Sequence, residues 1–350
     1  MRRRSAALLT SAGLTVVFAG AMSVLPVPYV SLSPGPVFNA LGDIQGKPVV
    51  AVSGANTYPT SGQLDATTVY ETGGPGSRLS LLDALRGWVD PAVAVVPSEL
   101  LHPKDETQQD AEQQGAEQMS FSQQDAVAAA LRYLGKPVHR VVQVQSVLSG
   151  SPADGVLKPA DRILRVDGTR VHSPDQVRRL ISSRKPGDAV TLTVVRGDKR
   201  MTFDVTTEQS PDDPGRAVIG VIPAEGYISP IDVKITLANV GGPSAGLVFA
   251  LAVIDKLTPG SLVGDAPVAG TGTITADGKV GAIGGIEQKM HGARQEGAQF
   301  FLAPGDNCSD VVGAVPDGLQ VVRVDTLKDA VTALESISSG DTANLPSCAA

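Results

Sequence analysis

The sequence predicts an α+β protein of several domains, and three observations support that prediction. A largely apolar stretch near the amino terminus is typical of a membrane-associated segment. A central block alternates strand-like runs with one capped helix, and a carboxyl-terminal block places a glycine-rich turn before an apolar helix. With 350 residues and 42% hydrophobic content, the chain is long enough for two or three domains with their own cores.

The amino-terminal segment, residues 1–28, is either a membrane anchor or a signal peptide. Three arginines at positions 2–4 precede a run from Ser5 to Gly42 that holds no charged residue, and its helix-compatible part ends near Pro26. About 20 apolar residues can cross a bilayer, and flanking arginines stay in the cytoplasm. A signal peptide would be cleaved near Ala19-Gly20-Ala21. The length of the stretch favours a retained single-pass anchor in the cell membrane, and both interpretations export the rest of the chain.

Residues 29–120 are expected to form a strand-rich extracytoplasmic region, to which we assign no function. Val49–Ser53 and Ala66–Tyr70 are strand-like, and Leu81–Trp88 has helical spacing. Lys104–Met119 carries five acidic residues and five glutamines, which favours a solvated connection over a core element.

Residues 121–207 have a pattern of their own. Val141–Val144 alternates like a strand, the Asp167-Gly168 pair suits a hairpin turn, and Ser173–Ser182 has the signature of a capped helix. In this order the elements resemble a PDZ domain of the type attached to bacterial exported proteases. Such domains bind an extended peptide, often its carboxyl terminus, as an added strand.

The resemblance also implies where that peptide would lie. The groove is expected between the strand at Val141 and the helix at Asp175–Ser182. Tyr133-Leu134-Gly135 is either the carboxylate-binding loop or an ordinary helix end. Residues 208–222, which are rich in Asp and Pro, are expected to be a linker.

The run Gly241–Leu247 predicts a positioned serine nucleophile at the start of a helix. Gly242 permits a tight backbone, and Pro243 has the fixed φ that suits a first helical turn. Ser244 would then lie beside free backbone N–H groups, which can stabilise a developing oxyanion.

Lys289 is predicted to lie on the apolar face of a later helix. Ile286, Lys289, Met290 and Ala293 share one face, whereas Glu287, Gln288, His291, Arg294 and Gln295 fall elsewhere. A lysine titrates near 10.4, so a general base at neutral pH needs a pKa lowered by about 3 units, which desolvation provides. The pattern therefore favours a Ser244–Lys289 dyad. The alternatives are an anion-binding turn and a lysine that reaches solvent.

Several motifs follow Gly242–Gly246 in a fixed order. They are Thr271-Gly272-Thr273-Ile274-Thr275, Gly278-Lys279-Val280, Ile283-Gly284-Gly285-Ile286 with Lys289, and Phe301-Leu302-Ala303-Pro304. Residues 223–340, which hold them, resemble the proteolytic domain of Lon proteases. The resemblance implies that Ser244 is the nucleophile and Lys289 the general base, with Thr271 hydrogen-bonding near the lysine. Many Lon enzymes have an acidic residue where this chain has Gly241.

An anchor, a PDZ domain and a Lon-type domain in this order resemble the membrane-anchored, PDZ-containing Lon-like peptidases of Gram-positive bacteria. The resemblance implies a serine endopeptidase that cleaves exported or misfolded polypeptides and binds some of them by their carboxyl termini. The sequence contains no Gly-x4-Gly-Lys-Ser/Thr motif, so we expect cleavage without ATP. Lon-type domains often form hexameric rings, so the resemblance implies a homo-oligomer.

Two other functions fit parts of the sequence. Gly242–Gly246 also satisfies Gly-x-Ser-x-Gly, the nucleophile elbow of α/β-hydrolase esterases, for which His291 would complete a Ser-His-Asp triad. Alternatively, the chain is a non-catalytic PDZ adaptor that presents clients to another protease.

Cysteine, histidine and charge limit the remaining possibilities. Cys308 and Cys348 either form a disulfide, which would attach the tail at 341–350, or are two free thiols. The histidines, His102, His139, His172 and His291, lack the spacing of metal ligands, so we expect neither a metal nor a cofactor. A net charge of −7 without a basic patch argues against nucleic acid.

Overall fold

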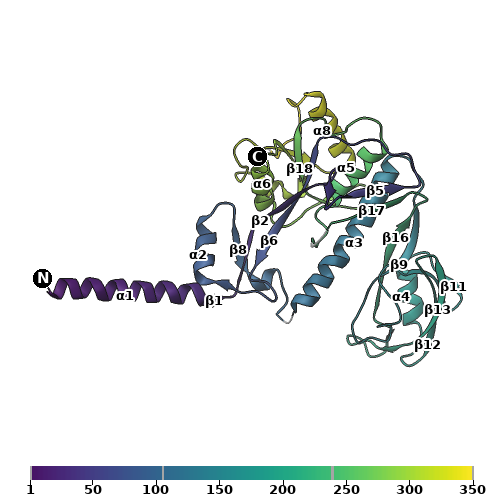
Figure 1. The fold of residues 1–350 in the computed structure, drawn as a ribbon. Coiled ribbons are helices and arrows are strands. Elements are labelled where there is room, and N and C mark those ends of the chain that lie inside the picture. Colours follow the sequence, from purple (N-terminus) through teal and green to yellow (C-terminus); the bar gives the residue numbers. More distant parts are fainter. Residues whose placement is uncertain (1, 105, 238–239, 349–350) are drawn as a thin grey trace.

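The computed structural model describes residues 2–104, 106–237 and 240–348. Its folded body has two lobes, and helix α1 (Arg2–Val24) projects away from both (Figure 1). The helix expected near the amino terminus therefore forms. Within the described ranges, no helix combines the length and the mean hydropathy of a membrane span.

A six-stranded mixed sheet forms the centre of the larger lobe, which we call the main lobe. Its strand order is β22-β21-β18-β6-β2-β8. The strands are β2 (Tyr29–Asn39), β6 (Gln63–Thr72), β8 (Ala94–Pro97), β18 (Pro267–Gly270), β21 (Phe300–Pro304) and β22 (Gln320–Val324). Parallel pairing joins β6, β18, β21 and β22, whereas β2 runs antiparallel to β6 and β8.

This sheet changes the expected division of the chain. Residues 29–120 do not form a region apart, because β2, β6 and β8 share the sheet with strands from residues 223–340. The strand-like runs at Val49–Ser53 and Ala66–Tyr70 are confirmed as β5 (Val50–Ser53) and part of β6. The helix expected at Leu81–Trp88 is α2 (Leu81–Val89).

Helices cover both faces of the sheet. Phe301 and Ala303 of β21 belong to the cluster beneath α6 (Ile286–Gln295), while Leu302 between them belongs to the cluster around α5 (Gly246–Leu257). That alternation follows from the two-residue period of a strand. Helix α5 is buried along nearly its whole length because it packs against β6, α3 (Gln108–Tyr133) and α8 (Leu327–Ser339).

Helix α3 begins earlier than the sequence suggested. The polar stretch expected to be a solvated connection is helical from Gln108 onward. Thr107 and Asp110 explain this start, because each side chain hydrogen-bonds the backbone N–H of the other residue in a capping box. Farther along the helix, Met119, Ala126 and Ala130 are buried and belong to the same core cluster as α5.

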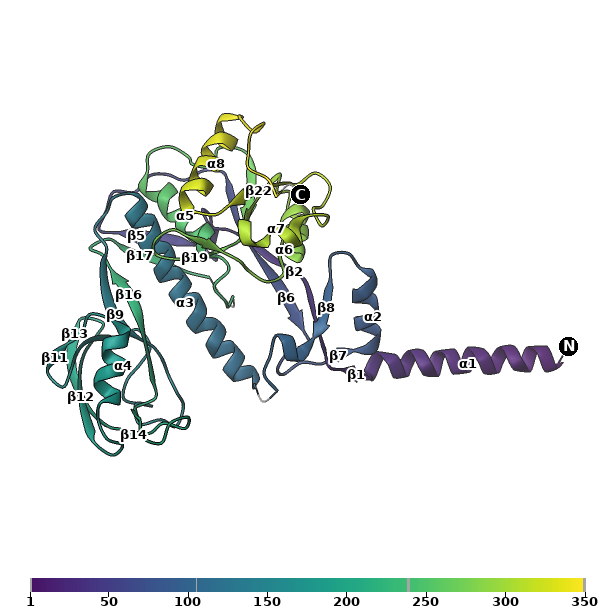
Figure 2. The same cartoon turned by 180° about the vertical axis from the view of Figure 1, so that it is seen from behind.

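The smaller lobe, residues 139–228, is an insertion in the main lobe. It contains β9 (His139–Val147), β10 (Arg162–Val166), β11 (Thr169–Arg170), α4 (Pro174–Ser182), β12 (Ala189–Arg196), β13 (Lys199–Thr206) and β16 (Val221–Ile228). Its main strand order is β13-β12-β10-β9-β16. The entering strand β9 and the leaving strand β16 pair antiparallel and run side by side to the main lobe (Figure 2).

The boundaries of this inserted lobe differ from those expected. Residues 121–133 belong to α3 and pack in the main lobe, and residues 208–222 are more than a linker. Strands β14 (Glu208–Gln209) and β15 (Ala217–Val218) pair there before β16 completes the sheet. The Asp-Gly turn is confirmed, since Asp167 and Gly168 have φ of 48° and 74°.

Short elements complete the fold. They are β1 (Pro26–Val27), β3 (Asp43–Ile44), β4 (Lys47–Pro48), β7 (Leu79–Ser80), η1 (Ser98–Leu100), β17 (Asp232–Ile235), β19 (Thr273–Ile274), β20 (Val280–Gly281), η2 (Gly305–Asn307) and α7 (Cys308–Val311). Strand β17 pairs with β5 and leads toward Ser244.

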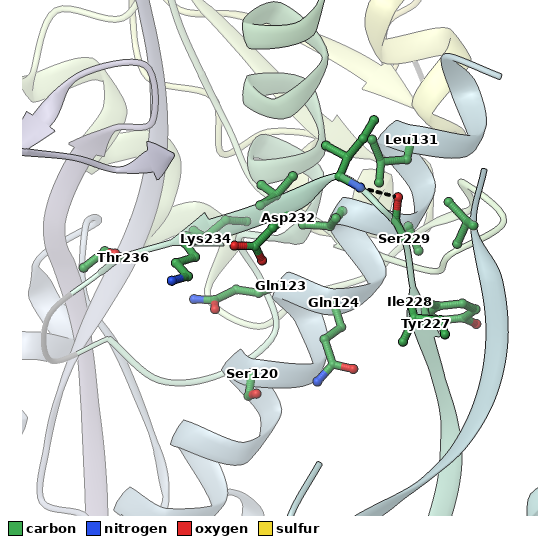
Figure 3. A pocket seen from close by; sticks show the side chains of 16 residues that line it. Ser120, Gln123, Gln124, Leu131, Tyr227, Ile228, Ser229, Asp232, Lys234 and Thr236 are labelled. Carbon is green, nitrogen blue, oxygen red and sulfur yellow. Dashed lines mark hydrogen bonds between the residues drawn. The ribbon is translucent and has the colours of Figure 1, made fainter. Parts of the chain in front are cut away.

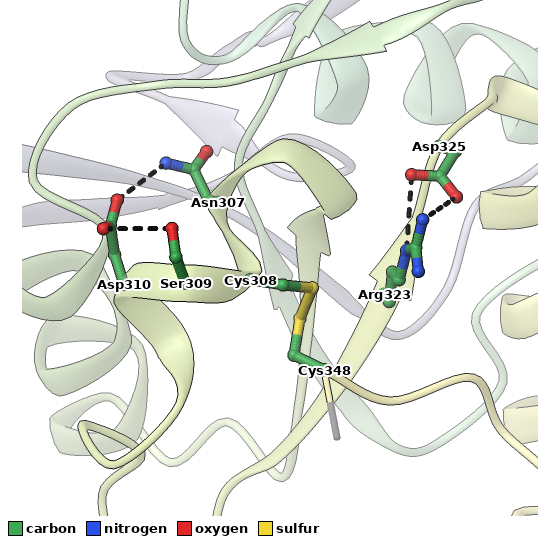
Figure 4. Close-up of a disulfide and its surroundings, with 7 residues drawn as sticks. All are labelled: Asn307, Cys308, Ser309, Asp310, Arg323, Asp325 and Cys348. Atoms are coloured by element: carbon green, nitrogen blue, oxygen red, sulfur yellow. Dashed lines mark hydrogen bonds and ion pairs between the residues drawn. A yellow bond between two sulfur atoms is a disulfide. The ribbon is translucent and has the colours of Figure 1, made fainter. Parts of the chain in front are cut away.

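The carboxyl-terminal tail is attached to the main lobe. Cys308 and Cys348 form a disulfide, as one of the two interpretations of the cysteines predicted (Figure 4). Nearby, the Arg323 N–H donates a hydrogen bond to the Pro346 carbonyl. The tail at 341–350 is therefore fixed beside β22, apart from residues 349–350, which lie outside the described range.

Candidate active site

The turn before α5 places Ser244 at the beginning of that helix. Gly242 has φ of +84°, a left-handed conformation that glycine adopts without strain, and Pro243 follows it. Helix α5 begins at Gly246, two residues later than the sequence suggested, with Ala245 as its N-cap. Ser244 is half-buried at this helix end.

Helix α3 stabilises the turn at Gly241–Ser244 through two hydrogen bonds. The Ser122 hydroxyl donates to the Pro243 carbonyl at 2.9 Å, and the Gly242 N–H donates to the Gly115 carbonyl, also at 2.9 Å. A Cβ on Gly241 would lie 3.2 Å from Gly115 Cα. Because two backbones meet here, a side chain at position 241 would force them apart. The glycine found in place of an acidic residue thus accommodates α3.

Gly246 allows the helix start to lie between α3 and β19. A Cβ at this position would approach Ser122 Oγ to 2.8 Å and Ile274 Cγ2 to 3.0 Å, closer than ordinary contacts. The last glycine of the Gly-x-Ser-x-Gly pattern therefore has a packing role.

Thr271 connects the serine to the sheet. Its hydroxyl donates to the Ser244 carbonyl at 3.0 Å, and the N–H of Gly272 donates to the same oxygen at 2.7 Å. The Leu247 N–H returns a bond to the Gly272 carbonyl at 3.0 Å. Thr271 is fully buried, so this contact is shielded from water.

Lys289 is buried close to this threonine. Only 3% of the residue is exposed, and Nζ donates to Thr271 Oγ1 at 3.3 Å. Burial lowers the pKa of the Lys289 ammonium to about 8, because the charged form loses its hydration. Ile286, Met290 and Ala293 are buried beside it, as predicted. Gln288 differs from the prediction, because it is also buried.

Gly285 sets the start of the lysine's helix. This residue is the N-cap of α6 with φ of +67°, and a Cβ on it would lie 2.8 Å from Val69 Cγ1. A side chain there would be both strained and crowded. The second glycine of the Gly284-Gly285 pair thus brings α6 against β6 and directs Lys289 inward.

The structure brings together Gly242, Pro243, Ser244, Thr271 and Lys289. Thr271 lies between the other two functional groups: it hydrogen-bonds Lys289 Nζ and the Ser244 carbonyl. Among the residues that the structure describes, Ser244 Oγ has no hydrogen-bond partner, and neither do the N–H groups of Ser244 and Ala245. The hydroxyl and these two donors are therefore free to meet a substrate.

Asn307 is a supporting residue that the sequence analysis missed. Its buried amide donates to the Ile283 carbonyl and accepts from the Ile283 N–H, both at 2.9 Å. These bonds fix the segment that precedes Gly284 and α6. Cys308 follows Asn307 directly, so the disulfide lies next to this clamp (Figure 4). In the sequence, only its position shortly after the Phe301–Pro304 motif could have indicated that Asn307 supports the site.

Two stretches of the chain match models of known protein families. A model of PDZ domains matches residues 119–207, and a model of the Lon protease (S16) C-terminal proteolytic domain matches residues 235–335. Residues 235–335 are a Lon-type proteolytic domain. Ser244, Thr271 and Lys289 all lie in the stretch that this model matches.

Curated relatives agree with the second match. The Lon protease of Mesomycoplasma hyopneumoniae (strain 232) is 40% identical over 88 residues, which are 24% of this chain and 10% of that protein. The Lon protease of Azospirillum brasilense is 37% identical over 92 residues, 25% of this chain and 11% of that protein. The chain thus spans about a tenth of the length of these curated relatives.

One solved structure is similar to part of this chain. It is the PDZ domain of an SdrC-like protein from Listeria monocytogenes, 32% identical over 23% of this chain and 84% of that chain, with a TM-score of 0.22.

The Lon-type domain borders a cleft of about 570 Å³ between α3 and the segment 227–236 (Figure 3). Gln123 and Gln124 come from α3, while Asp232 and Lys234 come from β17. The lining ends at Thr236 and does not include Ser244 or Lys289. The dyad therefore lies outside this cleft.

The strand at Val141 and α4 do not enclose the groove that was expected between them. Strand β16 occupies the edge of β9, so the strand at Val141 does not face α4. A cavity of about 620 Å³ lies instead between α4 and residues 217–223. Gly220 at its turn has φ of +73°, and within the described ranges the N–H groups of Ile219 and Gly220 have no partner. These donors can bind a carboxylate.

The other candidate for that loop is wrong. Leu134 and Gly135 donate to the carbonyls of Ala130 and Arg132, and Lys136 donates to Leu131. Gly135 also has φ of +65°. Tyr133-Leu134-Gly135 is therefore an ordinary helix end.

Histidines take no part in the dyad. Within the described ranges, no hydrogen bond joins a histidine to Ser244, and no group of His, Cys, Asp or Glu could hold a metal ion. His102 contacts Glu71 and Glu106 instead. Burial of the His102 ring opposes its charge, but hydrogen bonds to both carboxylates outweigh burial and raise its pKa.

Proposed function

We propose that the chain is an ATP-independent serine endopeptidase in which Ser244 is the nucleophile and Lys289 the general base. One observation carries the proposal: a buried lysine with a pKa of about 8 and a serine at a helix start share Thr271 as hydrogen-bond partner. Keeping an amine uncharged costs stability, and general-base catalysis is the use that needs it.

In the proposed reaction, Ser244 Oγ bonds to the carbon of a peptide carbonyl while its proton moves to neutral Lys289 Nζ. The carbonyl oxygen becomes an oxyanion, and the free N–H groups of Ser244 and Ala245 are its candidate donors. The C–N bond then breaks as Lys289 returns the proton to the leaving amine. Water, deprotonated by the same amine, hydrolyses the acyl-enzyme and restores Ser244.

The polypeptide would reach the dyad through the cleft beside α3. Polar side chains from α3 and β17 line it, which suits an extended main chain. Since the sequence has no phosphate-binding Gly-x4-Gly-Lys-Ser/Thr loop, the substrates would be exported or misfolded polypeptides that are already extended.

Recruitment and location are parts of the same proposal. The PDZ groove would bind substrate carboxyl termini, with the free N–H groups of Ile219 and Gly220 as donors. The amino-terminal segment would anchor the protein in the cell membrane with its bulk outside. The uncharged run at 5–42 behind three arginines supports this anchor. A hexameric ring is proposed on resemblance to Lon-type domains alone.

The test is cleavage of fluorescein-labelled casein by the full-length protein in detergent micelles, with and without ATP. Ser244→Ala and Lys289→Ala should each abolish cleavage, whereas His291→Ala should leave it unchanged. ATP should have no effect. Loss of activity in His291→Ala would favour the hydrolase elbow, and an inactive wild type would favour a non-catalytic adaptor. Circular dichroism of each variant separates lost chemistry from lost folding.

A further inference from the structure

The PDZ groove has one strand edge to offer, and that edge belongs to β16. Leu148 N–H bonds the Gly220 carbonyl, so Gly220 faces β9. Because successive residues of a strand point their backbone groups to opposite sides, Val221 and Pro223 face the groove. A bound peptide would therefore pair with these two residues.

Because Pro223 lies on the β16 edge, this edge offers few backbone N–H donors to a peptide. Val221 offers both an N–H and a carbonyl, but Pro223 has no N–H and offers its carbonyl alone. A peptide strand could thus make its full set of main-chain bonds only next to the turn at Ile219–Gly220. Farther along, side-chain contacts must supply more of the affinity.

Arg178 of α4 covers the remaining acceptor. Its guanidinium donates to the Pro223 carbonyl at 3.2 Å across the groove and contacts Asp175 at 2.6 Å. The side chain is 55% exposed, so it can move aside when a peptide arrives. Once displaced, it keeps its positive charge beside the peptide residue that has taken its place on Pro223.

We infer that the groove selects polypeptides by an acidic side chain two positions before their free carboxyl terminus, and that Arg178 reads it. The terminal carboxylate lies at the N–H groups of Ile219 and Gly220, and the last residue pairs with Val221. The residue two positions earlier then faces Pro223 and Arg178. Apolar walls from Ile181 and Leu148 favour an apolar last residue. This inference rests on the proposed role of the PDZ domain in recruitment.

The test uses full-length protein with Ser244→Ala, which prevents cleavage, and three fluorescein-labelled decapeptides that end in valine. They differ only in Asp, Asn or Lys two positions before the end, and a fourth peptide is the Asp form with an amidated terminus. Fluorescence anisotropy gives the dissociation constants. We expect Asp to bind about fivefold more tightly than Asn and Lys to bind most weakly, with no binding of the amide.

Two arginine variants test whether Arg178 causes the preference for Asp over Asn. Arg178→Gln should bring the Asp and Asn peptides within about twofold of each other. Arg179→Gln is the matched control, because this neighbour lines the same groove without bonding β16, and it should keep the preference. Asp175→Asn, which frees Arg178, should also keep it.

Three results would overturn the inference. Equal binding of the Asp, Asn and Lys peptides would do so while leaving PDZ recruitment intact. A preference that survives Arg178→Gln would assign selection to another residue. If no peptide binds, recruitment through this groove fails as well, whereas the casein assay would still decide the peptidase chemistry.

Discussion

Lys289 loses its hydration without gaining a carboxylate partner. Within the described part of the chain, its ammonium makes one hydrogen bond, to Thr271, and no salt bridge. Burial is thus the whole cause of the lowered pKa. An amine that titrates near pH 8 is neutral often enough to accept a proton and basic enough to do so readily.

This predicts the pH dependence of cleavage. kcat/KM should rise with pH and level off above a midpoint near 8, because only the neutral amine can accept the serine proton. Initial rates on labelled casein between about pH 6 and pH 9.5 would measure it. A midpoint near 6.5, the ordinary pKa of histidine, would contradict a lysine base.

The burial that would serve catalysis should also lower the stability of the folded protein. The Lys289 pKa falls from 10.5 to about 8 on folding, so the unfolded chain binds this proton more tightly. The free energy of unfolding should therefore rise with pH between about 8 and 10.5. Below about pH 8 the folded protein is destabilised by the full cost of burying this amine. Lys289→Met should gain up to roughly 3 kcal/mol at pH 7 while losing activity.

Urea unfolding of the wild type and Lys289→Met at about pH 7 and pH 10 would check this gain. The two proteins should differ most at the lower pH. A variant that is less stable at pH 7 would show that the lysine's contacts outweigh its desolvation.

At the scale of elements, the start of α5 depends on how closely α3 and β19 approach it. Gly246→Ala should abolish cleavage and lower stability by about 1–3 kcal/mol, because the added Cβ meets Ser122 and Ile274. Gly284→Ala is the matched control. This motif glycine has open space around its Cβ position and no positive φ, so cleavage and melting temperature should change little.

Local patterns predicted the elements that carry the dyad. The burial of Lys289 followed from helical spacing, and the serine turn followed from Gly-Gly-Pro-Ser. The hydrogen bond from Ser122 to Pro243, which supports this turn, was not predictable because the two residues are 121 positions apart. The groove was misplaced for a related reason. Its edge strand, β16, follows the block that looked complete and reaches β9 only through the fold.

At the scale of the molecule, the sequence predicted two kinds of domain but not their nesting. Strand pairing between β6 and β18 joins residues about 200 positions apart, and no short motif encodes it. The Lon-type match at 235–335 therefore covers only part of the lobe that holds the dyad. Strands β2 and β6 and helix α3 complete that lobe from before the insertion.

The disulfide should act on the stability of this lobe more than on its chemistry. Cys308 and Cys348 are 40 positions apart, so replacing both with serine should cost about 2–4 kcal/mol. Thermal unfolding in non-reducing buffer would measure the loss. Cleavage at 25 °C should remain, since Asn307 keeps its own hydrogen bonds to Ile283. Dithiothreitol should destabilise the wild type and leave the double variant unaffected.

Nesting has one practical consequence, which follows from the pairing of His139 with Ile228. Paired residues lie about 5 Å apart, so the points where the chain leaves and re-enters the main lobe are neighbours. We therefore expect that the PDZ domain can be removed without breaking the fold of the main lobe. Joining Val138 to Ser229 through two glycines should yield a folded core that no longer distinguishes substrates by their ends. The same junction could receive a different recognition domain, which should give the proposed peptidase other substrates.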